Sequence, residues 1–248
     1  MEVETVMLSF PDYVSVDLIH SFGIGMGIII LLIVLYEFIR WRAILSPIGR
    51  AIKLGPAKWW TIFFKTLADE IVYQQISVQC GRIKWISHSL VFWGFLALVA
   101  STTTNYINNP SGGWLPLTNI VRLLGNLGGV MILLGLAIVI YRARMDENKR
   151  TYTFAADYFF LTLLLLATLT GFLTEFASEL NAVELIYGVY VIHLLASAAL
   201  LLLAPFTRFI HAFGRPVIKL SERYLEALGH EGLLKPLEIT TIPLLGAE

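Results

Sequence analysis

Histidines are the residues of this chain whose type and spacing suggest chemistry. His193 and His211 lie 18 residues apart in one long apolar segment. Eighteen residues make five turns of an α-helix, so both imidazoles would project from one face, about 27 Å apart along the axis. That length is close to the ~30 Å hydrocarbon core of a bilayer. The spacing therefore predicts a nitrogen ligand near each surface of a membrane.

The composition indicates a membrane protein. The chain has 248 residues, of which 57% are apolar and 15% charged, and its mean hydropathy is +0.73. These values exclude an ordinary soluble domain. Because its apolar stretch is long and no basic region precedes it, the first apolar segment is not expected to be a cleavable signal peptide. We expect an all-α integral membrane bundle of five transmembrane helices, at about residues 16–39, 85–106, 119–141, 153–174 and 185–210.

Lysine and arginine predict the orientation. Every basic residue except Arg122 lies in the loop between the first two spans, in the loop between the third and fourth, or in the C-terminal tail. The positive-inside rule assigns these segments to the cytoplasm. We therefore expect a multi-pass protein of the cell membrane with its N-terminus outside and its C-terminus in the cytoplasm. No nucleic-acid partner is expected.

His20 and His193 are expected at similar depth near the outer surface. His20 lies eight residues after Asp12 at the beginning of the first span, and His193 lies nine residues after Glu184 at the beginning of the fifth. Both spans are expected to run inward, so the two imidazoles would lie at one level of the bilayer.

His88 and His211 are expected near the inner surface. His88 follows Lys84 by four residues where the second span begins. His211 lies between Arg208 and Arg215 where the fifth span ends. The four histidines therefore predict an outer pair and an inner pair of imidazoles.

Two pairs of imidazoles predict two stacked haems b. We expect the chain to bind at least one. Bis-imidazole ligation leaves the iron no open site for dioxygen, so such a haem transfers electrons. Haem propionates are anionic, and we expect Lys84, Arg208 and Arg215 beside the inner haem and chiefly Arg122 beside the outer one. An alternative stays open for each histidine, in which the ring is a core residue hydrogen-bonded to a backbone carbonyl.

Two stretches resemble a known family. The sequences YVIHLL at 190–195 and LAPFTRFIH at 203–211 resemble the last span of the respiratory nitrate reductase gamma subunits, which are five-span di-haem b cytochromes. The stretch QCGRIKWISH at 79–88, with FWGF at 92–95, is similar to one branch of that family. That branch contains the membrane subunits of heterodisulfide reductases and of sulfite-reductase-associated redox complexes.

The resemblance implies three of the ligands. His193 and His211 match the fifth-span ligands of the family, and His88 matches the inner ligand of the second span. The nitrate reductase subunits carry a further histidine ten residues along that span, where this chain has Leu98. The outer haem therefore needs another ligand, and the depth argument nominates His20.

Quinol is the expected mobile partner of such a membrane electron carrier. Its oxidation releases two protons, so a basic or hydrogen-bonding group is needed near the outer haem. We expect Glu175, at the outer end of the fourth span, to fill that role, assisted by Thr174 and by Asn105 at the outer end of the second span. In the alternative, Glu175 only marks the membrane boundary.

The family implies a cytoplasmic iron–sulfur partner. We expect one membrane domain over 1–228, and a C-terminal arm over 229–248. Within the cytoplasmic loop at 40–84, residues 57–65 mix aromatic and basic side chains, which is typical of an interfacial helix. The same loop and the tail, in which 217–228 predicts a short surface helix, are the expected docking surface of that partner.

The chain is therefore interpreted as the membrane cytochrome b subunit of a respiratory oxidoreductase complex. It would carry electrons between membrane quinol and the iron–sulfur partner through two bis-histidine haems b. One alternative is a single-haem form that uses only His88 and His211. Another is a haem-free membrane anchor or transporter. A lone Cys80 excludes a cysteine-ligated cluster within this chain, and His230 in the tail is expected to have no special role.

Overall fold

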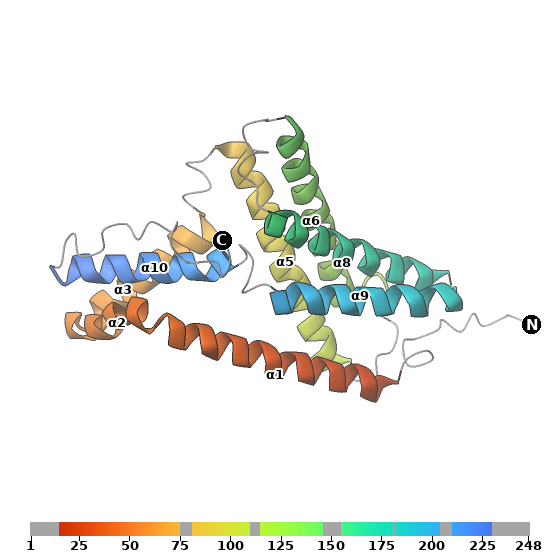
Figure 1. Ribbon diagram of the computed structural model, residues 1–248, viewed down its shortest axis with the longest axis horizontal. Coiled ribbons are helices and arrows are strands. Elements are labelled where there is room, and N and C mark those ends of the chain that lie inside the picture. Colours follow the sequence, from red (N-terminus) through yellow and green to blue (C-terminus); the bar gives the residue numbers. More distant parts are fainter. Residues whose placement is uncertain are drawn as a thin grey trace, which may run out of the picture. The chain divides into compact units, whose positions relative to one another are not determined.

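The computed structural model describes residues 15–74, 81–109, 115–145, 155–180, 182–203 and 210–229. Within these ranges every regular element is a helix, and five helices are long and apolar enough to cross a membrane. They are α1 (Val16–Arg40), α5 (Arg82–Asn108), α6 (Ile120–Met145), α8 (Ala155–Glu179) and α9 (Val183–Leu203), labelled in Figure 1. The predicted all-α fold with five spans is confirmed. The orientation of the termini stays a prediction.

The chain divides into two compact units. The first takes its described residues from 1–33 and 76–210, and so contains most of α1 and all of α5, α6, α8 and α9. The second takes its described residues from 34–75 and 211–248. It contains the end of α1 and the shorter helices α2 (Arg42–Arg50), η2 (Ala51–Leu54), α3 (Pro56–Leu67), η3 (Ala68–Val72) and α10 (Ile210–Ala227).

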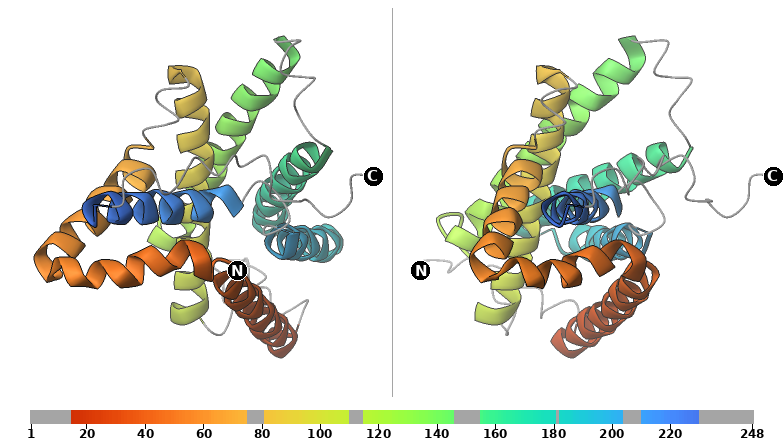
Figure 2. Two further views of the ribbon diagram at one scale, coloured as in Figure 1. Left: turned by 60° about the vertical axis from the view of Figure 1, so that its left-hand side comes forward. Right: turned by 90° about the vertical axis from the view of Figure 1, so that its left-hand side faces the viewer.

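Glycine allows α5 and α6 to pack closely in the first unit, where Figures 1 and 2 show them side by side. A Cβ atom added to Gly94 of α5 would lie 2.7 Å from the carbonyl oxygen of Gly128 and 3.1 Å from the backbone nitrogen of Ile132. A Cβ atom on Gly128 would lie 2.8 Å from the carbonyl oxygen of Gly94. Small residues that let two backbones approach are the usual basis of helix association in a bilayer.

The buried core of the first unit lies between α6, α8 and α9. Ile132 and Leu136 of α6 pack with Leu164 of α8 and Leu200 of α9. A Cβ atom on Gly129 of α6 would lie 2.7 Å from the ring of Phe172 on α8. α8 and α9 in turn pack along each other. These contacts fix α5, α6, α8 and α9 relative to one another.

In the second unit the loop that follows α1 packs against the tail helix α10. Tyr224 of α10 is fully buried, its ring stacks on that of Trp59 with 5.5 Å between centroids, and its hydroxyl donates to the Trp59 carbonyl at 2.9 Å. Burial raises the pKa of Tyr224 to about 12. The helix predicted over 217–228 is therefore present but begins earlier, at Ile210, and one of its sides is buried.

Ion pairs add to this packing in the second unit. Arg223 donates to Asp69 at 2.7 Å and to the hydroxyl of Thr66 at 3.1 Å. Arg215 donates to Glu70 at 2.9 Å. Asp69 and Glu70 lie on η3, which is a single stretch of π-helix. Loop and tail therefore form one folded body rather than two separate surface segments.

The close contact of α5 with α6 predicts that a glycine-to-alanine substitution destabilises the protein at this contact but not at an open position. Gly94→Ala should destabilise the protein by about 1–3 kcal/mol, because the added Cβ meets backbone atoms that cannot move aside. Gly188→Ala in α9 is the matched control, since nothing lies within 4 Å of its added Cβ and it gains the same helix propensity. Thermal unfolding of both variants in detergent measures the difference. Equal unfolding temperatures would contradict the described packing.

Candidate functional site

A cavity of about 680 Å³ lies in the first unit, and all five spanning helices contribute to its lining. Its volume falls within the range of about 300–1,000 Å³ that is usual for ligand and cofactor sites. It brings together five of the residues singled out in the sequence, namely His20, Asn105, Arg122, Glu175 and His193. Leu98, which the resemblance implies is the position of a further histidine, lines the same cavity.

His193 is held by a hydrogen bond to the backbone of α8. Its Nδ1 lies 2.9 Å from the carbonyl oxygen of Ala167 and 3.3 Å from the hydroxyl of Thr170. A carbonyl oxygen can only accept, so Nδ1 carries the proton, and in the neutral ring Nε2 keeps its lone pair. This contact is compatible with two roles. A histidine in a protein core can bond a backbone carbonyl, and a metal-ligating histidine does so with the ring nitrogen that does not bind the metal.

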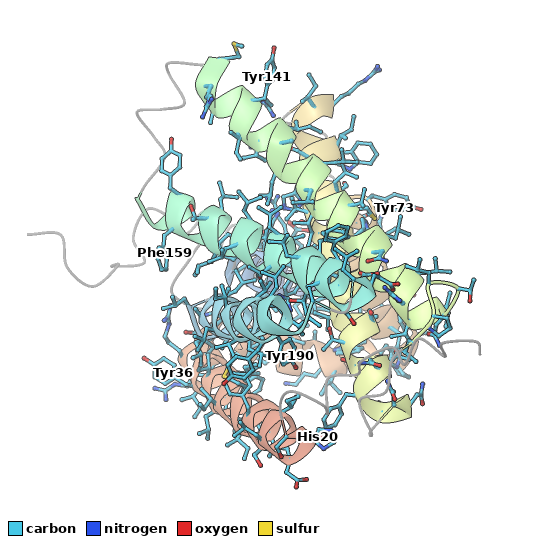
Figure 3. The ribbon with its side chains drawn as sticks, turned by 90° about the vertical axis from the view of Figure 1, so that its right-hand side faces the viewer. His20, Tyr36, Tyr73, Tyr141, Phe159 and Tyr190 are labelled. Carbon is cyan, nitrogen blue, oxygen red and sulfur yellow. The ribbon has the colours of Figure 1, made fainter. Side chains whose placement is uncertain are left out.

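Gly171 makes room for the His193 ring. A Cβ atom at this position of α8 would lie 3.2 Å from Cε1 of His193. Both residues line the cavity, as does Tyr190 one turn before His193 on α9 (Figure 3). Gly171 therefore lies against the Cε1 and Nδ1 atoms of the ring, where a larger residue would crowd it.

His20 contributes to the cavity from α1 (Figure 3). Its ring meets that of Tyr106 on α5 edge to face, with 5.1 Å between centroids. Gly23 and Gly27 follow on the same face of the helix and also line the cavity, and an added Cβ on either would contact nothing within 4 Å. On its cavity side, α1 therefore presents the His20 imidazole followed by two positions that have no side chain.

Packing alone fixes α1 weakly. None of its described side chains is buried, and many of its large apolar side chains are more than half exposed. Its only described aromatic contact with another helix of the first unit is that between His20 and Tyr106. Most of the surface of α1 can therefore face lipid, whereas the side that lines the cavity carries His20, Gly23 and Gly27.

Arg122 and two carboxylates form a charged cluster at the cavity. Arg122 donates to Glu175 at 2.7 Å, to the carbonyl of Leu115 at 2.8 Å, and to Glu179. Asn126 donates to the same oxygen of Glu175 at 2.9 Å. The Arg122 side chain is only 11% exposed. Arg122, expected beside haem propionates, is therefore already paired with protein carboxylates.

Glu179 is the member of this cluster that the sequence reasoning missed. It lies one turn after Glu175 on α8, so both carboxylates share a helix face. The signal was available, because Arg122 is the single basic residue expected on the outer side of the bilayer. Asn105, the other predicted proton-handling residue, lines the cavity and accepts a hydrogen bond from Asn109 at 3.3 Å.

The predicted inner histidines belong to different units, so their pairing stays a prediction. His88 lies on α5 with its ring stacked near that of Phe92, at 6.3 Å between centroids, and Lys84 is exposed one turn earlier. His211 is the second residue of α10 and belongs to the second unit. Arg208 lies outside the described residues, and Arg215, expected beside the inner haem, pairs with Glu70.

The continuity of the fifth span also stays a prediction. α9 is described up to Leu203 and α10 from Ile210, so His193 and His211 fall on two separately described helices. Residues 204–209 between them lie outside the described residues. The five-turn spacing on one helix is therefore an expectation from sequence alone.

A search of the described residues finds no group of three or more His, Cys, Asp or Glu side chains that could hold a metal ion. Cys80 lies outside the described ranges. A bis-histidine haem needs only two protein ligands, and the porphyrin supplies the other four. His20 and His193 are the two imidazoles that line the cavity, and their pairing on a haem stays a prediction.

Residues 117–187 match the Nitrate reductase gamma subunit family. This is a membrane cytochrome b family, so the resemblance proposed from the sequence is confirmed at that level. The match and the five apolar helices together support a multi-pass membrane protein. Over residues 117–187 the chain is similar to membrane cytochrome b subunits of respiratory oxidoreductases. Neither a curated protein nor a solved structure matches the chain.

The match covers α6, α8 and the beginning of α9. It therefore includes Arg122, Gly171 and Glu175, but it ends before His193. The stretches that suggested the resemblance, at 79–95 and 190–211, lie outside it. The similarity to heterodisulfide reductase and sulfite-reductase-associated subunits is not confirmed, and the haem ligands stay predictions.

The charged cluster predicts a coupled response to substitution. Arg122→Gln should destabilise the protein by about 3–5 kcal/mol, because it leaves two carboxylates without their largely buried cation. Glu175→Gln added to Arg122→Gln should restore part of the loss, as expected for residues in one network. Arg144→Gln, at the exposed end of the same helix, should change stability by less than about 0.5 kcal/mol. Thermal unfolding in detergent checks the series, and simple additivity of the two substitutions would argue against the cluster.

Proposed function

We propose that this chain carries electrons between membrane quinol and a cytoplasmic iron–sulfur partner, as the cytochrome b subunit of a respiratory complex. One observation carries the proposal: the cavity of the first unit is lined by His20 and His193 together with the predicted quinol residues. The helices α6 and α8, which contribute much of that lining, are those covered by the family match.

The outer haem would be held by His20 of α1 and His193 of α9. Two observations support this assignment. The hydrogen bond of His193 Nδ1 leaves Nε2 as the ligand atom. The cavity lining has no side chain at Gly23, Gly27 and Gly171. Leu98 in the same cavity marks where the family would supply a histidine and this chain does not. When bound, haem supplies one-electron redox chemistry.

Ligation by His20 would also connect α1 to the other helices. Helices in a bilayer associate through close packing and polar contacts, since lipid is as apolar as their side chains. α1 has no buried side chain among those described, so its packing contributes little. A ligand shared by His20 and His193 would join α1 to α9 directly. In this proposal α1 has a ligand role in place of a packing role.

A second haem would be held near the inner surface by His88 and His211. Lys84 and Arg208 are the basic residues proposed for its propionates, while Arg215 is already engaged with Glu70. The iron–sulfur partner would dock on the loop at 40–84 and on the tail. The folding of that loop with α10 into one body supports a single docking surface, because a partner would meet both segments at once.

Quinol oxidation gives a quinone, two electrons and two protons, and the cavity offers side chains for the protons. We assign Glu175 as the proton acceptor and Asn105 as a hydrogen-bonding partner of the quinol ring oxygen. Arg122 and Asn126 both donate to Oε1 of Glu175, which orients its carboxylate. Glu179, one turn along α8, is more exposed than Glu175, at 32% against 22%. It would therefore pass protons from Glu175 to water.

Haem counting tests the ligand assignment. Wild-type protein should contain two haems b per chain, and His20→Ala or His193→Ala should leave one, because each removes a ligand of the outer haem only. His230→Ala, in the tail, is the control and should keep both. Reduced-minus-oxidised spectra with haem quantification on purified protein provide the measurement. A wild-type content of one haem that His20→Ala leaves unchanged would favour the single-haem alternative, and a missing b-type α band would favour the haem-free anchor or transporter.

Quinol kinetics test the proton residues separately. Glu175→Gln should slow reduction of the bound haem by quinol by about 10²–10⁴-fold, the usual contribution of a positioned proton acceptor. Asn105→Ala should cause a smaller loss, since it removes one hydrogen bond. Both variants should keep the wild-type haem content. Glu226→Gln, on the exposed side of α10, serves as the control. Unchanged rates in Glu175→Gln would reject its assignment as acceptor.

A further inference from the structure

α3 of the second unit buries one side and exposes the other. Thr66 is fully buried and Trp59 is packed on Tyr224 of α10, so this side faces the core of the unit. On the other side Trp60 is 50% exposed and Phe64 is 61% exposed. Their rings lie one turn apart and stack at 5.4 Å between centroids. Two large aromatic side chains thus form an apolar patch that the second unit leaves uncovered.

Uncompensated positive charge lies in the same part of the chain. The segment 42–67 contains five basic residues and no carboxylate. All five are exposed, and none forms an ion pair in the described part of the chain; they are Arg42, Arg50, Lys53, Lys58 and Lys65. By contrast Arg215, Lys219 and Arg223 of α10 each pair with an acidic side chain. Among the described residues of the second unit, the cations without an ion pair are therefore those of α2, η2 and α3.

The connection to α1 indicates where this segment lies. The last residues of α1, from Val34 to Arg40, belong to the second unit, while the whole helix is a candidate membrane span. α2 begins at Arg42, two residues after α1 ends. The basic segment therefore begins at the boundary between hydrocarbon and water. Aromatic side chains concentrate at that boundary, and basic side chains there attract anionic headgroups.

We propose that α2, η2 and α3 bind the anionic phosphate headgroups of the membrane that α1 spans. Trp60 and Phe64 would enter the interfacial region, and the five cations would contact phosphates. On the exposed side of this segment the composition favours lipid over a protein partner, because lysine is depleted in protein–protein interfaces, whereas three of the five cations are lysines. The proposed iron–sulfur partner would then dock on the rest of the loop and on the tail. Basic amphipathic helices with aromatic side chains are the usual interfacial anchors. This proposal is independent of haem binding.

Quenching of Trp60 by brominated lipids tests the proposal. The full chain is reconstituted into vesicles of phosphatidylcholine and phosphatidylglycerol, with either lipid brominated in turn. The difference between wild type and Trp60→Phe isolates the fluorescence of Trp60. Its quenching should be stronger with brominated phosphatidylglycerol, which reports a preference for the anionic lipid. Lys58→Gln with Lys65→Gln should weaken that preference by about fivefold for each lysine removed.

A matched variant tests whether the lipid preference depends on the lysines of α3. Arg142→Gln with Arg144→Gln removes two cations at the end of α6 and should leave the preference at Trp60 unchanged. Equal quenching by both lipids would overturn the headgroup assignment. Absence of quenching by either lipid would overturn the proposal altogether and would assign this face to a protein partner. The measurement needs no bound cofactor, so its failure is distinct from failure of the haem assignment.

Discussion

The approach of α5 to α6 at Gly94 and Gly128 is the contact on which the first unit depends. In lipid, two helices gain little from burying apolar side chains, so association requires atoms that fit closely. Here each glycine lies against the other's carbonyl oxygen, and no side chain could intervene. This contact fixes α6, which in turn presents Arg122 and Asn126 to α8. The position of these polar residues at the cavity therefore depends on the backbone contact between α5 and α6.

The second unit is held together by a different combination of forces. Trp59 and Tyr224 combine ring stacking with a hydrogen bond, and two arginines of α10 reach the carboxylates of η3. A membrane surface is wet, so these polar contacts compete with water, and the buried rings exclude it. The loop after the first span and the tail after the fifth thereby become one body. This arrangement keeps the exposed side of α3 available while the tail is fixed beneath it.

Much of the fold followed from the sequence, because hydropathy and segment length dictate which stretches can cross a bilayer. Depth along each span also brought His20, His193, Asn105 and Glu175 to one level, and the cavity contains all four. The partners of Arg122 did not follow, because pairing depends on which faces of α6 and α8 meet. Likewise the burial of Tyr224 could not be anticipated, since hydrophobic periodicity in α10 does not reveal that the loop would cover it.

The charge count at the cavity has an energetic consequence. Arg122 carries one formal positive charge, whereas Glu175 and Glu179 carry two negative ones, so the cluster has a surplus of one negative charge. Negative charge near a redox group stabilises its oxidised form, which is the more positive of the two, and so lowers its reduction potential. A redox group bound in the cavity would therefore hold its electron less tightly than the same group without that surplus charge.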